Sequence, residues 1–121
     1  MPMIEHISLP VRSYAASRAF YTRVLAPLGY TLHMEFPDAG GFMEGEHTSF
    51  WIVEGEPTAS IHVAFRAESR EAVRAFYEVA LAAGATDNGA PGLRPNYSAD
   101  YYAAFVLDLD GHNIEAVCFG E

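Results

Sequence analysis

The chain has 121 residues, one cysteine and a hydrophobic fraction of 50%, so it can bury a core without disulfides. Seven Lys and Arg residues against sixteen Asp and Glu residues give a formal net charge of -9, which opposes binding to nucleic acid or anionic lipid. One cysteine excludes an internal disulfide, and no apolar run approaches the roughly 20 residues that a bilayer requires. These features predict a cytoplasmic protein whose partner is a small molecule, with no nucleic-acid or membrane partner.

The first elements in chain order are a strand and a helix. Alternation of apolar and polar residues predicts a strand over residues 4–11, with His6 on the less apolar face. Ser13 is a plausible N-cap for a helix over residues 14–26, which Gly29 ends. The apolar stripe of this helix consists of Phe20, Val24, Leu25 and Leu28. We interpret Phe20 and Tyr21 as core residues.

Three short strands are predicted next, over residues 31–36, 41–43 and 48–53. The stretch 43–46 contains Gly45 and is expected to form a hairpin turn between the last two.

A second strand and helix then repeat the first pair. His62 lies on the strand face opposite Ile61, Val63 and Phe65. Ser69 is expected to cap a helix that Gly84 ends. Its stripe at helical spacing consists of Val73, Phe76, Tyr77, Ala80 and Leu81.

The last third of the chain contains a loop and a hairpin. Residues 87–97 include two prolines and two glycines and are expected to form a loop with at most one short strand. Strands are predicted over residues 101–108 and 113–119, joined at Asp110-Gly111 by a type I′ turn with positive φ at both positions. Cys118 falls on the last strand, where we expect it to be buried and a weak nucleophile.

The two halves are copies of one unit. Moving the sequence against itself by 56 positions aligns nine identical residues among the 21 positions from His6 to Ala26. Unrelated sequences would give about one or two. The identities include His6 with His62, Ser13 with Ser69, and residues 18–21 with residues 74–77. We therefore predict one domain of two repeated modules, at about residues 1–56 and 57–121.

Three residues form a candidate metal site: His6, its repeat equivalent His62, and Glu115 in the last strand. If the two modules pair about a pseudo-two-fold axis, the equivalent histidines approach each other, and a carboxylate from the closing hairpin joins them. Two imidazoles and one carboxylate leave open positions on a divalent ion for a substrate. The alternatives are that the histidines are ordinary hydrogen-bonded polar residues and that Glu115 is solvated on an edge strand.

The sequence resembles the vicinal oxygen chelate superfamily, which includes glyoxalase I, extradiol dioxygenases and bleomycin resistance proteins. The resemblance rests on residues 6–11, 18–21, 61–65 and 108–115, with Leu25. It implies an α+β fold of two βαβββ modules related by a pseudo-two-fold axis, with mixed sheets curled around a cavity, helices outside, and a homodimer.

The resemblance also implies a function. It places metal ligands at His6, His62 and Glu115, with Glu115 catalytic, and a divalent ion of unknown identity (Fe, Mn, Ni, Zn or Co). The fourth ligand position of glyoxalase I falls at Phe50 or Trp51, neither of which is a good ligand. The implied activity is that of a lyase, isomerase or dioxygenase acting on neighbouring substrate oxygens. The alternatives are a non-catalytic drug-binding protein and a scaffold with a vestigial pocket.

Further candidates line the predicted cavity. Trp51 either fills it or stacks on a planar ligand. Arg94, Tyr97, Tyr101 and Tyr102 either recognise an anionic or phenolic substrate or anchor the loop. His33, His47 and His112 have no partner at informative spacing and are interpreted as surface residues.

Overall fold

The computed structural model describes residues 4–120 and contains two modules with the same order of strands and α-helix. The first module consists of β1 (Ile7–Val11), α1 (Tyr14–Val24), the 3-10 helix η1 (Ala26–Leu28), β2 (Thr31–Phe36), β3 (Ala39–Glu44) and β4 (His47–Glu54). The second consists of β5 (His62–Arg66), α2 (Arg70–Ala82), β6 (Thr86–Leu93), β7 (Tyr101–Leu107) and β8 (Asn113–Phe119). The predicted pair of βαβββ modules in an α+β fold is confirmed.

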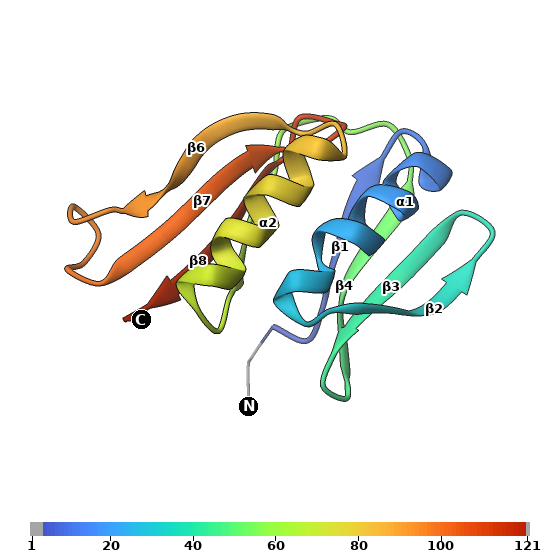
Figure 1. Ribbon diagram of the computed structural model, residues 1–121. Helices are drawn as coiled ribbons and strands as arrows, with labels where there is room; N and C mark the ends of the chain where they lie inside the picture. The colour runs from blue at the N-terminus through green and yellow to red at the C-terminus, as the bar shows by residue number, and fades with distance from the viewer. Residues whose placement is uncertain (1–3, 121) are drawn as a thin grey trace.

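Each module builds one mixed sheet of four strands. The orders are β1-β4-β3-β2 and β5-β8-β7-β6, so equivalent strands occupy equivalent places. The first strand of each module pairs in parallel with its last strand, and the other pairs are antiparallel. Figure 1 shows the two modules side by side, with α1 and α2 next to each other.

Identical capping fixes where the two helices begin. Ser13 Oγ accepts from the Ala16 N–H, and Ser69 Oγ accepts from the Ala72 N–H. These bonds satisfy amide groups that the first helical turn leaves without an intrahelical partner. The repeat in sequence is therefore also a repeat in helix-capping chemistry.

One core joins the modules. The predicted stripe of the first helix is buried (Phe20, Val24, Leu25 and Leu28), and so are Val73, Phe76 and Ala80 of α2. The rings of Phe50 on β4 and Phe65 on β5 meet with centroids 5.1 Å apart, which connects the two sheets. The core reading of Phe20 and Tyr21 is confirmed, and Cys118 is buried as expected.

Three local predictions differ from the structure. The first strand begins at Ile7, so Ile4 and His6 precede it. The helix expected over residues 14–26 is α-helical only to Val24, because Pro27 disfavours α conformation in the residue before it. Between Asp108 and His112 only Gly111 has positive φ, at 87°, so the hairpin is at the predicted place but its turn is not type I′.

The segment expected to be a loop is mostly strand. Residues 86–93 form β6, whose pairing with β7 shifts register between Asp87 and Gly89 and again before Gly92. β6 is the edge of its sheet, where a proline such as Pro91 is tolerated and bulges are common.

Neither of the helices described here has the length and apolar character needed to cross a membrane.

Candidate functional site

A histidine and a glutamate of the second module meet on the sheet face opposite α2. His62 is the first residue of β5, and Glu115 lies in the middle of β8. Ala64 is the register partner of Glu115, so His62 and Glu115 are diagonal neighbours on one face. His62 Nε2 lies 2.8 Å from Glu115 Oε1, and the imidazole donates because a carboxylate only accepts.

Glu115 is buried although it is acidic. Its residue exposure is 2%, whereas the His62 side chain is 53% exposed. The alternative of a solvated carboxylate on an edge strand is wrong, because β8 lies between β5 and β7. A buried carboxylate requires partners, and His62 supplies one of them.

Tyr101 supplies the second partner. Its hydroxyl donates to Glu115 Oε2, so each carboxylate oxygen has its own hydrogen bond. Burial, together with this hydrogen bond and the charge of Glu115, raises the pKa of Tyr101 to about 12. A cavity of about 490 Å³ opens above the group and is lined by His62, Asn96, Tyr97, Tyr101, Phe105 and Glu115. All six belong to the second module.

His6 lies apart from this group. It precedes β1, its side chain is 51% exposed, and its Nδ1 lies 2.6 Å from Glu5 Oε1. Among residues 4–120, no three His, Cys, Asp or Glu side chains gather where they could hold a metal ion. One chain therefore brings together two of the three predicted ligands, and the curling of both sheets around one cavity stays a prediction.

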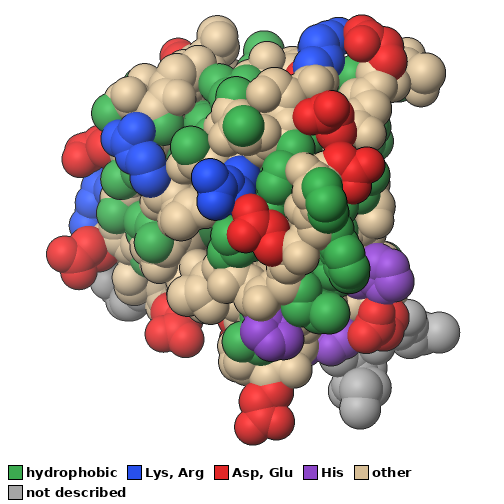
Figure 2. Space-filling view, turned by 90° about the vertical axis from the view of Figure 1, so that its right-hand side faces the viewer, with side chains coloured by type: hydrophobic (Ala, Val, Ile, Leu, Met, Phe, Trp, Pro, Cys, Tyr) green, Lys and Arg blue, Asp and Glu red, His purple; other side chains and the backbone are tan. Residues whose placement is uncertain are grey.

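Trp51 packs on its own sheet. Its ring stacks on that of Phe36, with centroids 6.2 Å apart and an interplanar angle of 24°. A Cβ at Gly41 would lie 2.8 Å from the indole, so the glycine provides the space for it. Figure 2, viewed from the side of β2 and β3, shows hydrophobic side chains gathered along one part of this surface with histidines at its lower end.

Arg94 and Tyr97 lie near the cavity of the second module. The Arg94 guanidinium donates to the backbone oxygens of Gly92 and Ala90, both at 2.9 Å, and lies over the ring of Phe105. These contacts are those of a loop anchor. Tyr97 is 62% exposed and lines the cavity, and its ring packs edge-on against Tyr101 at 4.9 Å.

Tyr102 is on the other face of its strand. Its hydroxyl accepts from Arg74 of α2, and the Arg70 guanidinium lies 4.9 Å from its ring centroid. The structure does not bring Tyr102 together with His62 and Glu115.

Of the three histidines interpreted as surface residues, His33 is exposed and His47 is half-buried, but His112 is fully buried. The surface interpretation of His112 is wrong. Its Nδ1 accepts from the Ile61 N–H at 3.0 Å, and its Nε2 donates to the Pro10 carbonyl at 2.9 Å. Those two bonds hold the neutral imidazole with its proton on Nε2.

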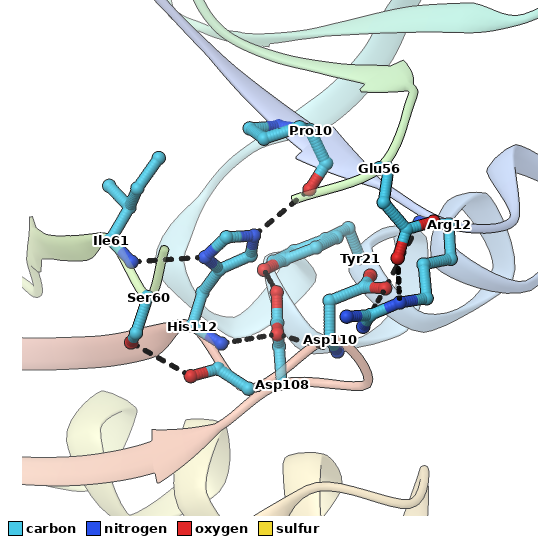
Figure 3. A network of polar contacts seen from close by, with 10 residues as sticks. Pro10, Arg12, Tyr21, Glu56, Ser60, Ile61, Asp108, Asp110 and His112 are labelled. Atoms are coloured by element: carbon cyan, nitrogen blue, oxygen red, sulfur yellow. Dashed lines mark hydrogen bonds and ion pairs between the residues drawn. The ribbon is translucent and has the colours of Figure 1, made fainter. Parts of the chain in front are cut away.

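The turn that carries His112 fastens the second module to the first (Figure 3). Asp108 Oδ1 accepts from the backbone N–H groups of Asp110 and His112, and Asp108 Oδ2 accepts from the hydroxyl of Tyr21 on α1. Asp110 in turn accepts from Arg12, which follows β1. No sequence spacing indicates this network, because several of its partners are backbone groups far away in the chain.

Tyr21 makes stability sensitive to alkaline pH. Burial, the charge of Asp108 and the hydrogen bond to it raise the pKa of Tyr21 well above its ordinary value of 10.0. Above about pH 10 the unfolded chain loses the tyrosine proton while the folded chain keeps it, so stability falls as pH rises.

We therefore expect the free energy of unfolding, measured with urea, to decrease between about pH 9 and about pH 11. The slope should be smaller in Tyr21→Phe than in Tyr97→Phe, which removes an exposed hydroxyl. Equal slopes in the two variants would contradict the assignment to Tyr21.

The family model described as Glyoxalase/Bleomycin resistance protein/Dioxygenase superfamily matches residues 3–116. The chain belongs to this superfamily. No curated protein matches the sequence.

Solved structures of similar proteins agree with the family. A glyoxalase/bleomycin resistance protein from Albidiferax ferrireducens is 25% identical with a TM-score of 0.85, covering 97% of this chain and 99% of that one. A family enzyme from Burkholderia phytofirmans is 23% identical with a TM-score of 0.78, covering 97% and 98%. A lactoylglutathione lyase from Agrobacterium tumefaciens is 16% identical with a TM-score of 0.74, covering 98% and 94%. The last two comparisons show a shared fold.

Proposed function

We propose that the protein is a small cytoplasmic metalloenzyme of the glyoxalase and dioxygenase type. In this proposal His62 and Glu115 of one chain, with His6 of a second chain, hold a divalent ion. The observation that carries it is the pairing of the His62 imidazole with the buried Glu115 carboxylate at 2.8 Å, beside an open cavity. The reaction belongs to the lyase, isomerase or dioxygenase class.

The donor atoms fit a divalent ion. Imidazole nitrogen and carboxylate oxygen are ligands for Fe, Mn, Ni, Zn and Co, and two such donors at about 2.1 Å from one ion lie about 3 Å apart at a right angle. The separation of His62 Nε2 and Glu115 Oε1 is close to that value. An ion bound there would act as a Lewis acid toward two neighbouring oxygens of a substrate.

A second copy of the chain would complete the ligand set. His6 is half-exposed and lies just before β1, an edge strand. Each sheet carries exposed large hydrophobic side chains, including Phe36 at 55% on the first and Phe119 at 45% on the second. Exposed apolar groups of this kind favour burial against a partner. In a symmetric dimer the first sheet of each chain would pack against the second sheet of the other, so this contact would form twice.

The chain's own residues would bind and orient the substrate. Tyr97 and Phe105 form an aromatic wall of the cavity, with Arg94 behind Phe105. Glu115, at the base of the cavity, is proposed both as a ligand and as the catalytic carboxylate in contact with the reacting substrate. Trp51 would face the substrate from the sheet of the partner chain, whereas Tyr102 is left out because it bonds to α2.

Metal content tests the proposal. Protein purified without a chelating step is expected to contain about one divalent ion per chain by elemental analysis, and His62→Ala is expected to contain almost none. His33→Ala, which removes an exposed histidine, is the matched control. Protein that is metal-free, cannot be loaded with any of the five ions, and is unchanged by His62→Ala would refute a metal site.

The second candidate is a non-catalytic binding module. The exposure of Tyr97, at 62% beside the cavity, favours it because such a ring can stack on a planar ligand. A ligand that binds with an affinity unchanged by a chelator, in protein that holds no metal, would support this candidate over the enzyme.

A further inference from the structure

Tyr101 is fixed on the face that carries His62 and Glu115. Its ring packs edge-on against Tyr97 on one side and against Phe119 on the other, with centroids 4.9 Å and 5.3 Å away. Phe119 is also its register partner on β8. A tyrosine held from two sides has little freedom to move its hydroxyl away from Glu115.

The two oxygens of Glu115 have different partners. Oε1 faces His62, and Oε2 accepts from the Tyr101 hydroxyl. The residues directly beside Glu115 in the sheet, Ala64 and Phe105, have no polar side-chain atom to compete for Oε2. If the Tyr101 hydroxyl keeps its hydrogen bond to Oε2, only Oε1 of Glu115, on the side of His62, can bind a metal ion.

This assignment matters for the choice of ion. Ca²⁺ takes six to eight oxygen ligands and commonly binds both oxygens of a carboxylate, whereas first-row transition ions accept imidazole and a single carboxylate oxygen. A residue that hydrogen-bonds to the atom of a metal-ligating side chain that does not bind the metal also orients that side chain.

We infer that Tyr101 is a positioning residue that restricts Glu115 to one-oxygen coordination, and so makes the site selective for transition ions over Ca²⁺. The inference rests on the proposed function of this site. Tyr101 touches the ligand and not the ion, so it acts on metal choice through Glu115.

The test compares metal affinities of three proteins. Metal-free wild type, Tyr101→Phe and Tyr97→Phe are each titrated with Zn²⁺ and with Ca²⁺ by calorimetry. Tyr101→Phe is expected to lose about 10-fold or more in Zn²⁺ affinity, without a matching loss for Ca²⁺. Tyr97→Phe removes a hydroxyl from the same cavity without touching Glu115 and should keep the wild-type ratio.

A second readout separates positioning from a merely structural role. The visible absorption of the Co²⁺-loaded protein reports ligand number, so wild type and Tyr101→Phe should differ in band intensity. It can be recorded at low temperature if the variant is less stable. Because phenylalanine keeps the contacts with Tyr97 and Phe119, the variant is expected to fold.

The outcomes distinguish this inference from the proposed function. If wild type binds Zn²⁺ and Tyr101→Phe shows the same affinity ratio and the same Co²⁺ spectrum, the role of Tyr101 is overturned and the metal site stands. If wild type binds none of these ions, the proposed function and the inference fail together.

Discussion

Replacing His112 with alanine is expected to lower the free energy of unfolding by about 3 kcal/mol or more, which is large for a single substitution. The imidazole is fully buried and bonds to the Ile61 N–H and the Pro10 carbonyl. Its removal opens a cavity and leaves two partly buried backbone groups without these bonds, where an uncompensated buried polar group costs about 1–3 kcal/mol. Urea unfolding followed by circular dichroism measures the change.

His33→Ala is the matched control for this prediction. His33 is exposed, and its bond to Thr48 is on the surface, so we expect a change within about 0.5 kcal/mol. A loss in His112→Ala no greater than that in His33→Ala would show that the contacts between the modules do not depend on this side chain.

The second large effect concerns sites shared between chains. His6→Ala and His62→Ala are each expected to hold almost no metal alone. In a mixed pair of chains one of the two shared sites keeps both histidines. Random re-association gives about half mixed pairs, so mixing equal amounts should restore about one quarter of the wild-type metal content.

The control for the mixing experiment is a second mixture, in which both variants lack a ligand from the second module. Mixing His62→Ala with Glu115→Ala should restore nothing, because the proposal takes His62 and Glu115 from the same chain in every site. Recovery in that mixture, or none with His6→Ala, would contradict the sharing of ligands. Size-exclusion chromatography of each mixture verifies that pairs have formed.

Most of the fold could be predicted because the signals are local and occur twice. The serine caps at Ser13 and Ser69, the apolar stripe of α2 and the alternating apolar residues of β1 and β5 are each signals within a few neighbouring residues. The repeat then confirms each of them in the other module. The length of β6 was underestimated because glycine and proline are typical of loops, and only its place at a sheet edge makes a strand over residues 86–93 compatible with them.

The candidate site could be predicted only in part. The pairing of His62 with Glu115 follows from register between strands that are adjacent in the sheet but far apart in sequence. The burial of Glu115 depends on strand order, which no local pattern encodes. His112 was misinterpreted because both hydrogen bonds of its imidazole go to backbone groups of distant residues, and backbone partners leave no trace in residue types.

The turn around His112 also affects how two shared sites would communicate. It ties β8, which carries Glu115, to the end of β1, and His6 lies just before that strand begins. In a symmetric pair each chain would lend His6 to one site and Glu115 to the other. The bond from His112 to Pro10 would then connect the elements that carry the ligands of the two sites. Ligand binding at one site would therefore shift the positions of the metal ligands at the other.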